Sequence, residues 1–382
     1  MKIVYCCPQL FHPGGMERII SMKANYLADV YGYEVFIITE KQFGNKPFYK
    51  LSDKIKHIDL GLDYDGLAKA SLLKSVINRI ILKKRQKRFL KNVLEDIKAD
   101  IVISTFFSEA SILPSIQDGS KKILEIHFCR GVKMMYAKAF HFSVVKKCLY
   151  YIQQSIDEHI IVPKYDCFVT LTEEDKQCWR TIIPNVVAIP NILTFNNIGI
   201  VGLEAKQIIA VGRLDAQKGV DRLINIWTKV CCRFDWNLKI VGAGFDHDKL
   251  QDLIKTKNME AYITLKPPTQ FIYEEFCSSS IFVMTSRYEG LPMVMLEAMS
   301  CGLPCITYDF KCGPRDIISN GHNGFICKED DEQDFANKLS LLMTNKELRL
   351  KMGLNARASV QKYKADIIMP KWRKLFEEII EK

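Results

Sequence analysis

Short apolar runs alternate with longer segments of helical spacing along the whole chain. A strand that is apolar on both sides is typical of a parallel sheet covered by helices on both faces. Because the strand–helix alternation occurs twice, the pattern predicts an α/β fold of two doubly wound parallel-sheet domains. The predicted strands are Lys2–Cys7, Glu34–Thr39, Asp100–Thr105, Lys121–Phe128, Asp166–Thr172, Gln207–Leu214, Leu238–Gly244, Ser280–Ser286 and Leu303–Asp309.

The division between the two halves falls near IPNILTFNNIGIVGLEAK, residues 189–206. This segment contains a proline, several asparagines and glycines, and no strong helical period, as expected of a linker. We therefore expect a first domain over residues 1–190 and a second over residues 200–364. A chain of 382 residues, 48% of them hydrophobic, is long enough for two cores.

Charge is distributed unevenly between these halves. Residues 1–190 carry 28 Lys/Arg against 20 Asp/Glu, a net charge of +8, whereas the remainder carries 26 against 24, a net of +2. The first domain is therefore expected to meet an anionic partner. The 13 cysteines form no Cys-x-x-Cys, which favours reduced thiols in a cytoplasmic protein over a zinc site or a disulfide framework. No signal peptide and no membrane-spanning run is expected.

The segment SRYEGLPMVMLEAMSCGLP, residues 286–304, joins a predicted loop to a very apolar helix. Pro292 suits the first turn of that helix and Gly302 its end. Glu297 falls inside the apolar part, where an unpaired carboxylate is costly. Its partner is either an internal group, such as an arginine or a backbone donor, or a polar ligand with hydroxyl groups, such as a ribose.

Glu289 lies in the loop just before this helix. The start of a helix, with its free N–H groups and partial positive charge, is a natural phosphate site. A carboxylate beside such a site fits a ligand with a further part to recognise, and a nucleotide sugar has a diphosphate, a ribose and a second sugar. The residues expected at the start of the helix are Gly290, Leu291, Pro292 and Met293.

Other candidate residues also follow predicted strands, where ligands bind in open α/β sheets. In VGRLDAQKGVDRLI, Arg213 follows a strand and Lys218 precedes a helix. Two cations on one loop can clamp a diphosphate, although a solvated loop has the same composition. IVGAGFD, which contains Gly242, matches only the start of a G-x-G-x-x-G motif and is weak support for a nicotinamide site.

The first domain offers a glycine pair and a histidine. Gly14, Gly15 and Glu17 follow the first strand and open a helix. Glycines there let a ligand approach the backbone closely, or serve only as a turn. His127 ends the strand ILEIH. A single histidine is more often a satisfied core or surface residue than a ligand-binding one, so it needs support from the other residues.

Together these segments resemble the family-4 glycosyltransferases of the GT-B fold. Glu289 and Glu297 reproduce that family's Glu–x7–Glu motif, and VGRLDAQKG resembles its diphosphate loop. CGPRDIISNGHNGFIC, FHPGGMER and FVTLTEED resemble other family segments, and the likeness is patchy between residues 45 and 120. It implies two Rossmann-like domains that face a central cleft, with a C-terminal helix, residues 365–382, crossing back to the first domain.

The resemblance also implies roles for single residues. Arg213 and Lys218 would bind the donor diphosphate and stabilise the leaving group. Glu297 would hold the ribose hydroxyls, and Glu289 would contact the transferred sugar. His127 would contact that sugar from the opposite wall. Such enzymes are retaining and need neither a cofactor nor a metal, because Arg, Lys and helix N-termini meet the phosphate charge.

The remaining expected contacts are at glycines. Gly15 would let the donor or acceptor approach the first domain, with Gly14 and Glu17 on the acceptor side. Gly242 would lie at the donor. The family's habit favours a UDP-sugar as donor, and the acceptor is a lipid-linked or other oligosaccharide.

A basic segment in the first domain, KSVINRIILKKRQKRFLK (residues 74–91), contains eight Lys/Arg and no acid. Val76, Ile80, Ile81, Phe89 and Leu90 give it an apolar side. Such a helix can lie on an anionic membrane, meet the diphosphate of a polyprenyl-linked acceptor, or simply be solvated. No nucleic-acid recognition motif accompanies it. The cations expected to contact the membrane are Lys83, Lys84, Arg85, Lys87 and Arg88.

The resemblance thus implies a retaining glycosyltransferase of bacterial surface polysaccharide synthesis, moving a hexose or N-acetylhexosamine at the inner face of the plasma membrane. Two alternatives are a nucleotide-sugar 2-epimerase and a non-catalytic nucleotide-sugar-binding scaffold on the membrane. The Glu–x7–Glu context disfavours the epimerase. The presence of Arg213, Lys218, Glu289 and His127 disfavours the scaffold.

Overall fold

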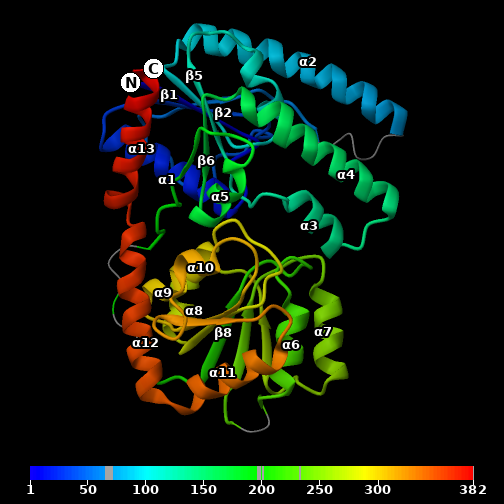
Figure 1. Ribbon diagram of the computed structural model, residues 1–382, viewed down its shortest axis with the longest axis vertical. Coiled ribbons are helices and arrows are strands. Elements are labelled where there is room, and N and C mark those ends of the chain that lie inside the picture. The colour runs from blue at the N-terminus through cyan, green and yellow to red at the C-terminus, as the bar shows by residue number, and fades with distance from the viewer. Residues whose placement is uncertain (65–71, 196–198, 200–201, 232–233, 382) are drawn as a thin grey trace. The chain divides into compact units, whose positions relative to one another are not determined.

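The computed structural model describes residues 1–64, 72–195, 199, 202–231 and 234–381. The chain divides into two compact units, each with its own sheet (Figure 1). Part of the expected linker, residues 196–198 and 200–201, lies outside the described residues. Unit 1 comprises Met1–His127, Ile152–Ile192 and Ala365–Lys382, and unit 2 comprises Phe128–Tyr151 and Leu193–Lys364.

In the described part of unit 1, the sheet has seven parallel strands in the order β3-β2-β1-β4-β5-β6-β7. The central strand β1 pairs with β2, Lys2 opposite Glu34, and with β4, Ile3 opposite Ile101. The strands are β1 (Lys2–Cys7), β2 (Glu34–Thr39), β3 (Lys56–Asp59), β4 (Ile101–Ser104), β5 (Lys121–Glu125), β6 (Cys167–Thr170) and β7 (Val186–Ala188).

Helices cover this sheet through apolar faces. Leu90, Leu94 and Ile97 of α2 pack in one cluster with Val4 and Phe36 of the sheet. Leu90, one of the residues expected on an apolar side of this segment, therefore packs in the core. Helices α1 and α13 lie side by side (Figure 1). The main helices are α1 (Gly15–Asp29), α2 (Leu72–Ile97), α5 (Glu173–Arg180) and α13 (Ala365–Ile380).

The described sheet of unit 2 is also parallel, with the order β10-β9-β8-β11-β12-β13. Strands β11 and β12 are wholly buried and β8 is buried at its three central residues, which explains their continuous apolar character. The strands are β8 (Gln207–Val211), β9 (Asn237–Val241), β10 (Ile263–Lys266), β11 (Ile281–Met284), β12 (Cys305–Tyr308) and β13 (Gly324–Cys327).

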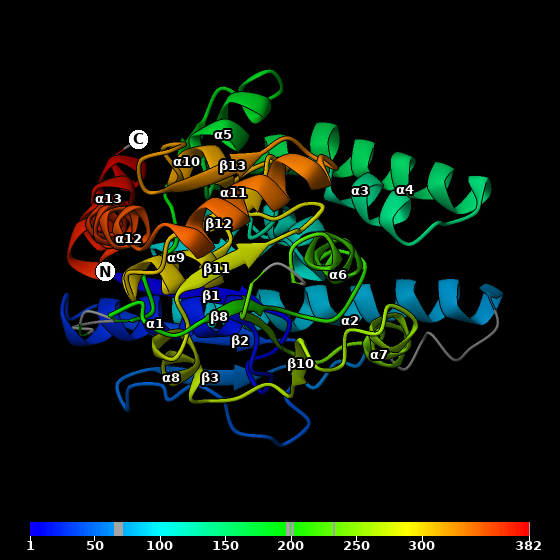
Figure 2. The ribbon, with the colours of Figure 1, turned by 90° about the horizontal axis from the view of Figure 1, so that it is seen from below.

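The helices of unit 2 pack in pairs against this sheet. Helix α9 lies beside α12, and α6 lies beside α11 (Figure 2). As predicted, α9 begins after Pro292 and ends before Gly302, whose φ is +84°. The helices are α3 (Val132–Ala139), the start of α4 (Val144–Ile156), α6 (Val220–Thr228), α7 (His247–Thr256), α8 (Ile272–Cys277), α9 (Met293–Ser300), α10 (Pro314–Ile317), α11 (Glu332–Thr344) and α12 (Lys346–Ser359).

The predicted fold class, two doubly wound parallel-sheet domains, is confirmed. The sequence did not predict strands β3, β7, β10 and β13, which lie at or beside sheet edges and are only three or four residues long. The segment Phe128–Tyr151, expected in the first domain, groups with unit 2. Its Cys129 is buried in one cluster with Tyr288 and Cys312 of that unit.

Candidate active site

In unit 2 the chain connections change direction between β8 and β11: one run of strands extends to β10, the other to β13. In open α/β sheets a crevice forms at such a point, at the carboxyl ends of the two strands. Arg213 and Lys218 follow β8, and Glu289 follows β11. The fold therefore brings these three predicted residues together at the carboxyl ends of β8 and β11.

Lys218 and Glu289 form an ion pair, with Nζ 2.6 Å from Oε1. Ser286 Oγ donates a hydrogen bond to the same carboxylate oxygen at 2.7 Å. The two paired side chains are only 16% and 9% exposed, so their attraction is screened less than it would be in bulk water. Gly212, Lys218 and Thr285 line a small hollow beside the pair. The Lys218 ammonium group is thus held in a fixed position at the carboxyl ends of β8 and β11.

Arg213 is the more exposed cation of the loop. Its Nη2 donates to Gln217 Oε1 at 2.6 Å, and its Nε lies 3.1 Å from Asp215 Oδ2. Gln217 Nε2 in turn donates to the carbonyl of Tyr288 at 3.1 Å. The loops that follow β8 and β11 are therefore tied together. Because a guanidinium has five N–H donors, Arg213 retains donors for an anionic ligand.

Two glycines allow neighbouring backbone segments to approach each other closely at these strand ends. Gly219 has a φ of +63°, and a Cβ there would lie 2.2 Å from the carbonyl oxygen of Thr285. A Cβ at Gly242 would lie 1.8 Å from the carbonyl oxygen of Gly212. A side chain at either position would displace the neighbouring strand end. Gly242, predicted as a donor contact, therefore has a structural reason to be glycine.

Helix α9 carries the second glutamate of the motif. Pro292 is the residue before its first turn, Leu291 is buried, and Gly290 and Met293 are half-buried. Glu297 is buried, as the sequence predicted. Its Oε1 accepts a hydrogen bond from Thr194 Oγ1 at 2.5 Å. A hydroxyl group thus satisfies part of this carboxylate in the free protein, and contact with a ribose stays a prediction.

In unit 1, Gly14, Gly15 and Glu17 follow β1, beside the change of direction between β1 and β4. Burial raises the pKa of the Glu17 carboxyl above its ordinary value. A Cβ at Gly14 would lie 2.0 Å from Glu17 Oε2, whereas nothing lies within 4 Å of a Cβ at Gly15. Only the flexible end of the Glu17 side chain would have to move for a Cβ at Gly14, and Gly15 borders open space.

His127 comes two residues after β5, and burial lowers its pKa to about 4. The imidazole is therefore neutral at pH 7. Its Nε2 lies 3.4 Å from Oε1 of Glu125, the last residue of β5. A neutral, buried imidazole is suited to a hydrogen bond with an uncharged group such as a sugar hydroxyl.

Behind His127 lies a buried ion pair that the sequence reasoning missed. Lys23 Nζ is 2.5 Å from both carboxylate oxygens of Glu125, and neither side chain is exposed. The ring of Trp372, on α13, lies 3.9 Å from the ammonium group. The sequence contained a signal for this ion pair. Lys23 falls on the apolar side of α1 with Ile19 and Leu27, where a buried lysine requires a partner of opposite charge.

A second missed feature is a buried acid after β4. Glu109 Oε1 accepts hydrogen bonds from Ser104 Oγ at 2.7 Å and from the Thr105 amide at 3.1 Å. Burial, together with the nearby charge of Glu40, raises the pKa of Glu109 to about 7. Glu40 in turn accepts from Gln86 Nε2 of α2 at 3.2 Å. No periodic pattern reports this arrangement, because Gln86 lies 46 positions from Glu40 and Glu109 lies 69 positions from it.

The raised pKa predicts a pH-dependent stability. Between pH 4.5 and about 7, native Glu109 holds a proton that the unfolded chain has released, so its contribution to stability falls as the pH rises. Glu109→Gln, which stays neutral, should therefore be more stable relative to wild type at pH 8 than at pH 5. Urea denaturation at both pH values measures this difference. The control is Glu95→Gln on the surface of α2, and equal differences at both pH values would contradict the prediction.

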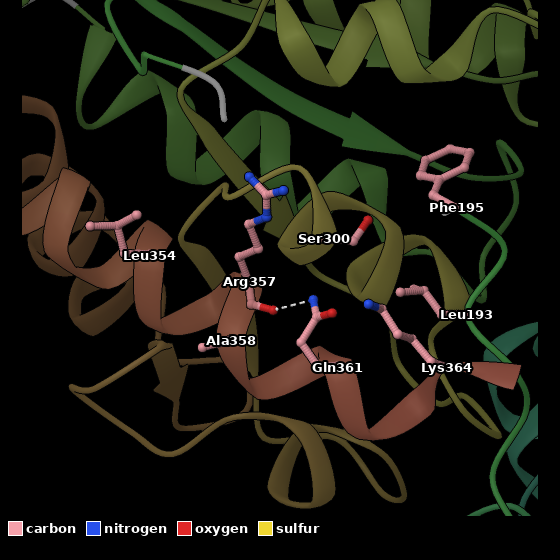
Figure 3. Close-up of a pocket in the computed structure, with 8 residues that line it drawn as sticks. All are labelled: Leu193, Phe195, Ser300, Leu354, Arg357, Ala358, Gln361 and Lys364. Atoms are coloured by element: carbon pink, nitrogen blue, oxygen red, sulfur yellow. Dashed lines mark hydrogen bonds between the residues drawn. The ribbon is translucent and has the colours of Figure 1, made fainter. Parts of the chain in front are cut away.

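A separate hollow of about 290 Å³ lies in unit 2, beside the last residue of α9 (Figure 3). Gln361 Nε2 donates to the carbonyl oxygen of Arg357 at 2.9 Å along its wall. No predicted site residue lines this hollow, so it is not the predicted donor site. Its lining residues are Leu193, Phe195, Ser300, Leu354, Arg357, Ala358, Gln361 and Lys364.

Known proteins are similar to this chain in sequence and in fold. The family model described as "Glycosyl transferases group 1" matches residues 197–359. An uncharacterized glycosyltransferase of Haemophilus influenzae is 30% identical over 380 residues, 97% of this chain and 99% of that protein. The N-acetylgalactosamine-N,N'-diacetylbacillosaminyl-diphospho-undecaprenol 4-alpha-N-acetylgalactosaminyltransferase of Campylobacter jejuni is 28% identical over 240 residues, 60% of this chain and 63% of its own.

A solved structure extends the likeness of fold. A TarM variant from S. aureus, in complex with fondaparinux, α-GlcNAc-glycerol and UDP, matches with a TM-score of 0.77 and 18% identity, over 98% of this chain and 99% of that one. This match shows the GT-B fold, and the nearly full-length relative at 30% identity shows the family. The chain belongs to the group 1 glycosyltransferases.

Proposed function

We propose that the protein is a retaining glycosyltransferase that moves a hexose or N-acetylhexosamine from a UDP-sugar to a lipid-linked glycan acceptor, in the synthesis of a bacterial surface polysaccharide. The observation that carries the proposal is the Lys218–Glu289 ion pair at the strand ends of β8 and β11. A cation and a carboxylate held side by side match a donor that offers a diphosphate and sugar hydroxyls.

In this proposal Arg213 and Lys218 stabilise the leaving group. As the bond between the anomeric carbon and the phosphate oxygen breaks, negative charge grows on the diphosphate. Fixed cations and the start of α9 then stabilise the transition state more than the bound substrate. Glu289 and Ser286 hold Lys218 in place before the donor arrives, so little reorganisation is needed when charge develops.

The sugar and ribose hydroxyls of the donor are recognised by side chains other than Arg213 and Lys218. Glu289 contacts its hydroxyls, Glu297 the ribose, and neutral His127 a further hydroxyl. The acceptor oxygen forms its bond to the anomeric carbon on the face that the diphosphate leaves, and its proton passes to the departing phosphate oxygen. This route preserves the anomeric configuration and needs no protein base.

The identities of donor and acceptor are supported by relatives. The TarM variant was solved with UDP, and the Campylobacter jejuni relative is named for a diphospho-undecaprenol-linked acceptor. The proposed reaction needs neither a metal nor a cofactor.

We also propose that α2 docks on the anionic inner face of the plasma membrane, close to a lipid-linked acceptor. Among the described residues, no helix has both the length and the apolar character needed to span a bilayer. Cations near an anionic surface each add about 1 kcal/mol of attraction. The five cations of α2 that are expected to contact the membrane are all exposed: Lys83, Lys84, Arg85, Lys87 and Arg88.

A thermal-shift panel of nucleotide sugars tests the donor site. A ligand at 100 times its Kd stabilises the native state by about 2.7 kcal/mol, which is a rise in Tm of roughly 5–10 °C for a domain of this size. We expect UDP and a UDP-sugar to give such a rise, and Glu297→Ala to reduce it. Glu347→Ala, at an exposed position on α12, is the matched control. If no nucleotide raises the Tm of the wild type, the proposed donor site is wrong.

A further inference from the structure

Helix α4 leaves its apolar side uncovered. None of its residues is buried, although it is strongly amphipathic in sequence, VVKKCLYYIQQSI. Four apolar residues at helical spacing form one stripe and are 42% to 73% exposed: Val145, Leu149, Ile152 and Ile156. Soluble proteins usually bury such a stripe, so a continuous exposed one marks an interaction surface.

The other side of this helix already has its packing partners. Tyr150 of α4 stacks on Tyr136 with ring centroids 6.4 Å apart, and Phe142 contacts both rings. Lys146 Nζ lies 3.5 Å from the centre of the Phe142 ring. The aromatic cluster fixes α3 and the start of α4 as a hairpin. The stripe is therefore not the side that this hairpin needs for its own folding.

The charge on α4 itself is of one sign, whereas Asp157 and Glu158 follow directly after Ile156. Residues 126–156 contain no Asp or Glu and five Lys/Arg, among them Lys146 and Lys147 of α4. Two copies of this chain meeting through the stripe would bring these cations together, which is unfavourable. An anionic lipid surface offers both an apolar layer and complementary charge. The chemistry thus favours a bilayer over a second copy.

We infer that the stripe on α4 inserts into the headgroup region of an anionic phospholipid bilayer. This rests on the proposed function, because it places the enzyme at the membrane that holds a lipid-linked acceptor. It adds a hydrophobic anchor to the electrostatic docking proposed for α2. Helix α2 shows the same combination, with Ile77, Ile80 and Ile81 exposed beside its cations.

Vesicle co-sedimentation separates insertion from charge attraction. Leu149→Glu should lower binding to phosphatidylglycerol-containing vesicles about tenfold or more, the scale of losing one buried leucine. The loss should persist in 1 M salt, where surface charge is screened. Leu341→Glu, an exposed leucine of α11, is the matched control and should bind like the wild type. Equal binding by Leu149→Glu and the wild type would overturn the inference.

Position 148 offers a direct readout of insertion. Of the described cysteines, Cys148 is the exposed one, and it borders the stripe. An environment-sensitive dye on Cys148 should shift to the blue with vesicles, whereas dye-treated Cys148→Ser should not. A wild-type dimer that Leu149→Glu dissociates, with no dye shift, would assign the stripe to a second copy instead. UDP binding in the thermal-shift test is independent of these outcomes, so failure of either proposal can be recognised separately.

Discussion

Lys218→Ala is expected to lower kcat by about 100-fold or more, the scale of losing one preorganised charge donor. The structure supplies the reason, because Lys218 Nζ is held 2.6 Å from Glu289 at the carboxyl ends of β8 and β11. An alanine there removes the fixed charge that meets the departing diphosphate. Since this charge matters most in the transition state, turnover should fall more than UDP binding does. Steady-state kinetics and thermal shift with UDP measure the two effects.

The matched control for this experiment is Lys206→Ala. Lys206 directly precedes β8 and so lies at the amino end of that strand, away from the proposed donor site. On the surface its Nζ pairs with Asp235 Oδ2 at 2.9 Å. It should leave kcat within about twofold of the wild type, because exposed ion pairs contribute little. Near-normal turnover by a folded Lys218→Ala protein would remove Lys218 from the proposed mechanism.

Lys23→Met is expected to lower the free energy of unfolding by about 3–5 kcal/mol, because it leaves the Glu125 carboxylate buried without its counter-ion. Both side chains are fully buried, and the ammonium group also lies against Trp372. Burial holds the pKa of Lys23 below its ordinary value, so the pair is costly to build and more costly to break. Urea denaturation followed by tryptophan fluorescence measures the loss.

Two further variants make this result specific. Lys23→Met combined with Glu125→Gln should be more stable than Lys23→Met alone, because no buried charge is then left unpaired. Lys91→Met removes an exposed partner of Glu95 and should change stability by no more than about 0.5 kcal/mol. A double variant no more stable than the single one would contradict a buried ion pair.

The sequence predicted the interior strands and the ends of α9 because these depend on local signals. The runs Lys2–Cys7 and Glu34–Thr39 match β1 and β2 at both ends. Continuous Val and Ile content reports burial on both faces, and Pro292 and Gly302 have backbone preferences that mark helix ends. Arg213, Lys218 and Glu289 each follow a predicted strand. They could therefore be expected near one another, because the carboxyl ends of parallel strands lie at the same end of the sheet.

The features that the sequence could not predict depend mostly on contacts between residues far apart in the chain. Lys23 and Glu125 are 102 positions apart, and neither residue shows which carboxylate or ammonium group it meets. The four short strands β3, β7, β10 and β13 have few residues over which to show a period. The grouping of Phe128–Tyr151 with unit 2 likewise depends on the contact of Cys129 with Tyr288, which no local pattern reports.

A crystal structure of the protein with UDP tests the central claim most directly. The account predicts a phosphate oxygen within hydrogen-bonding distance, about 3 Å, of Lys218 Nζ. It also predicts a ribose hydroxyl within the same distance of the Glu297 carboxylate. UDP bound elsewhere in unit 2, for example in the hollow beside Ser300 and Arg357, would contradict the proposed donor site.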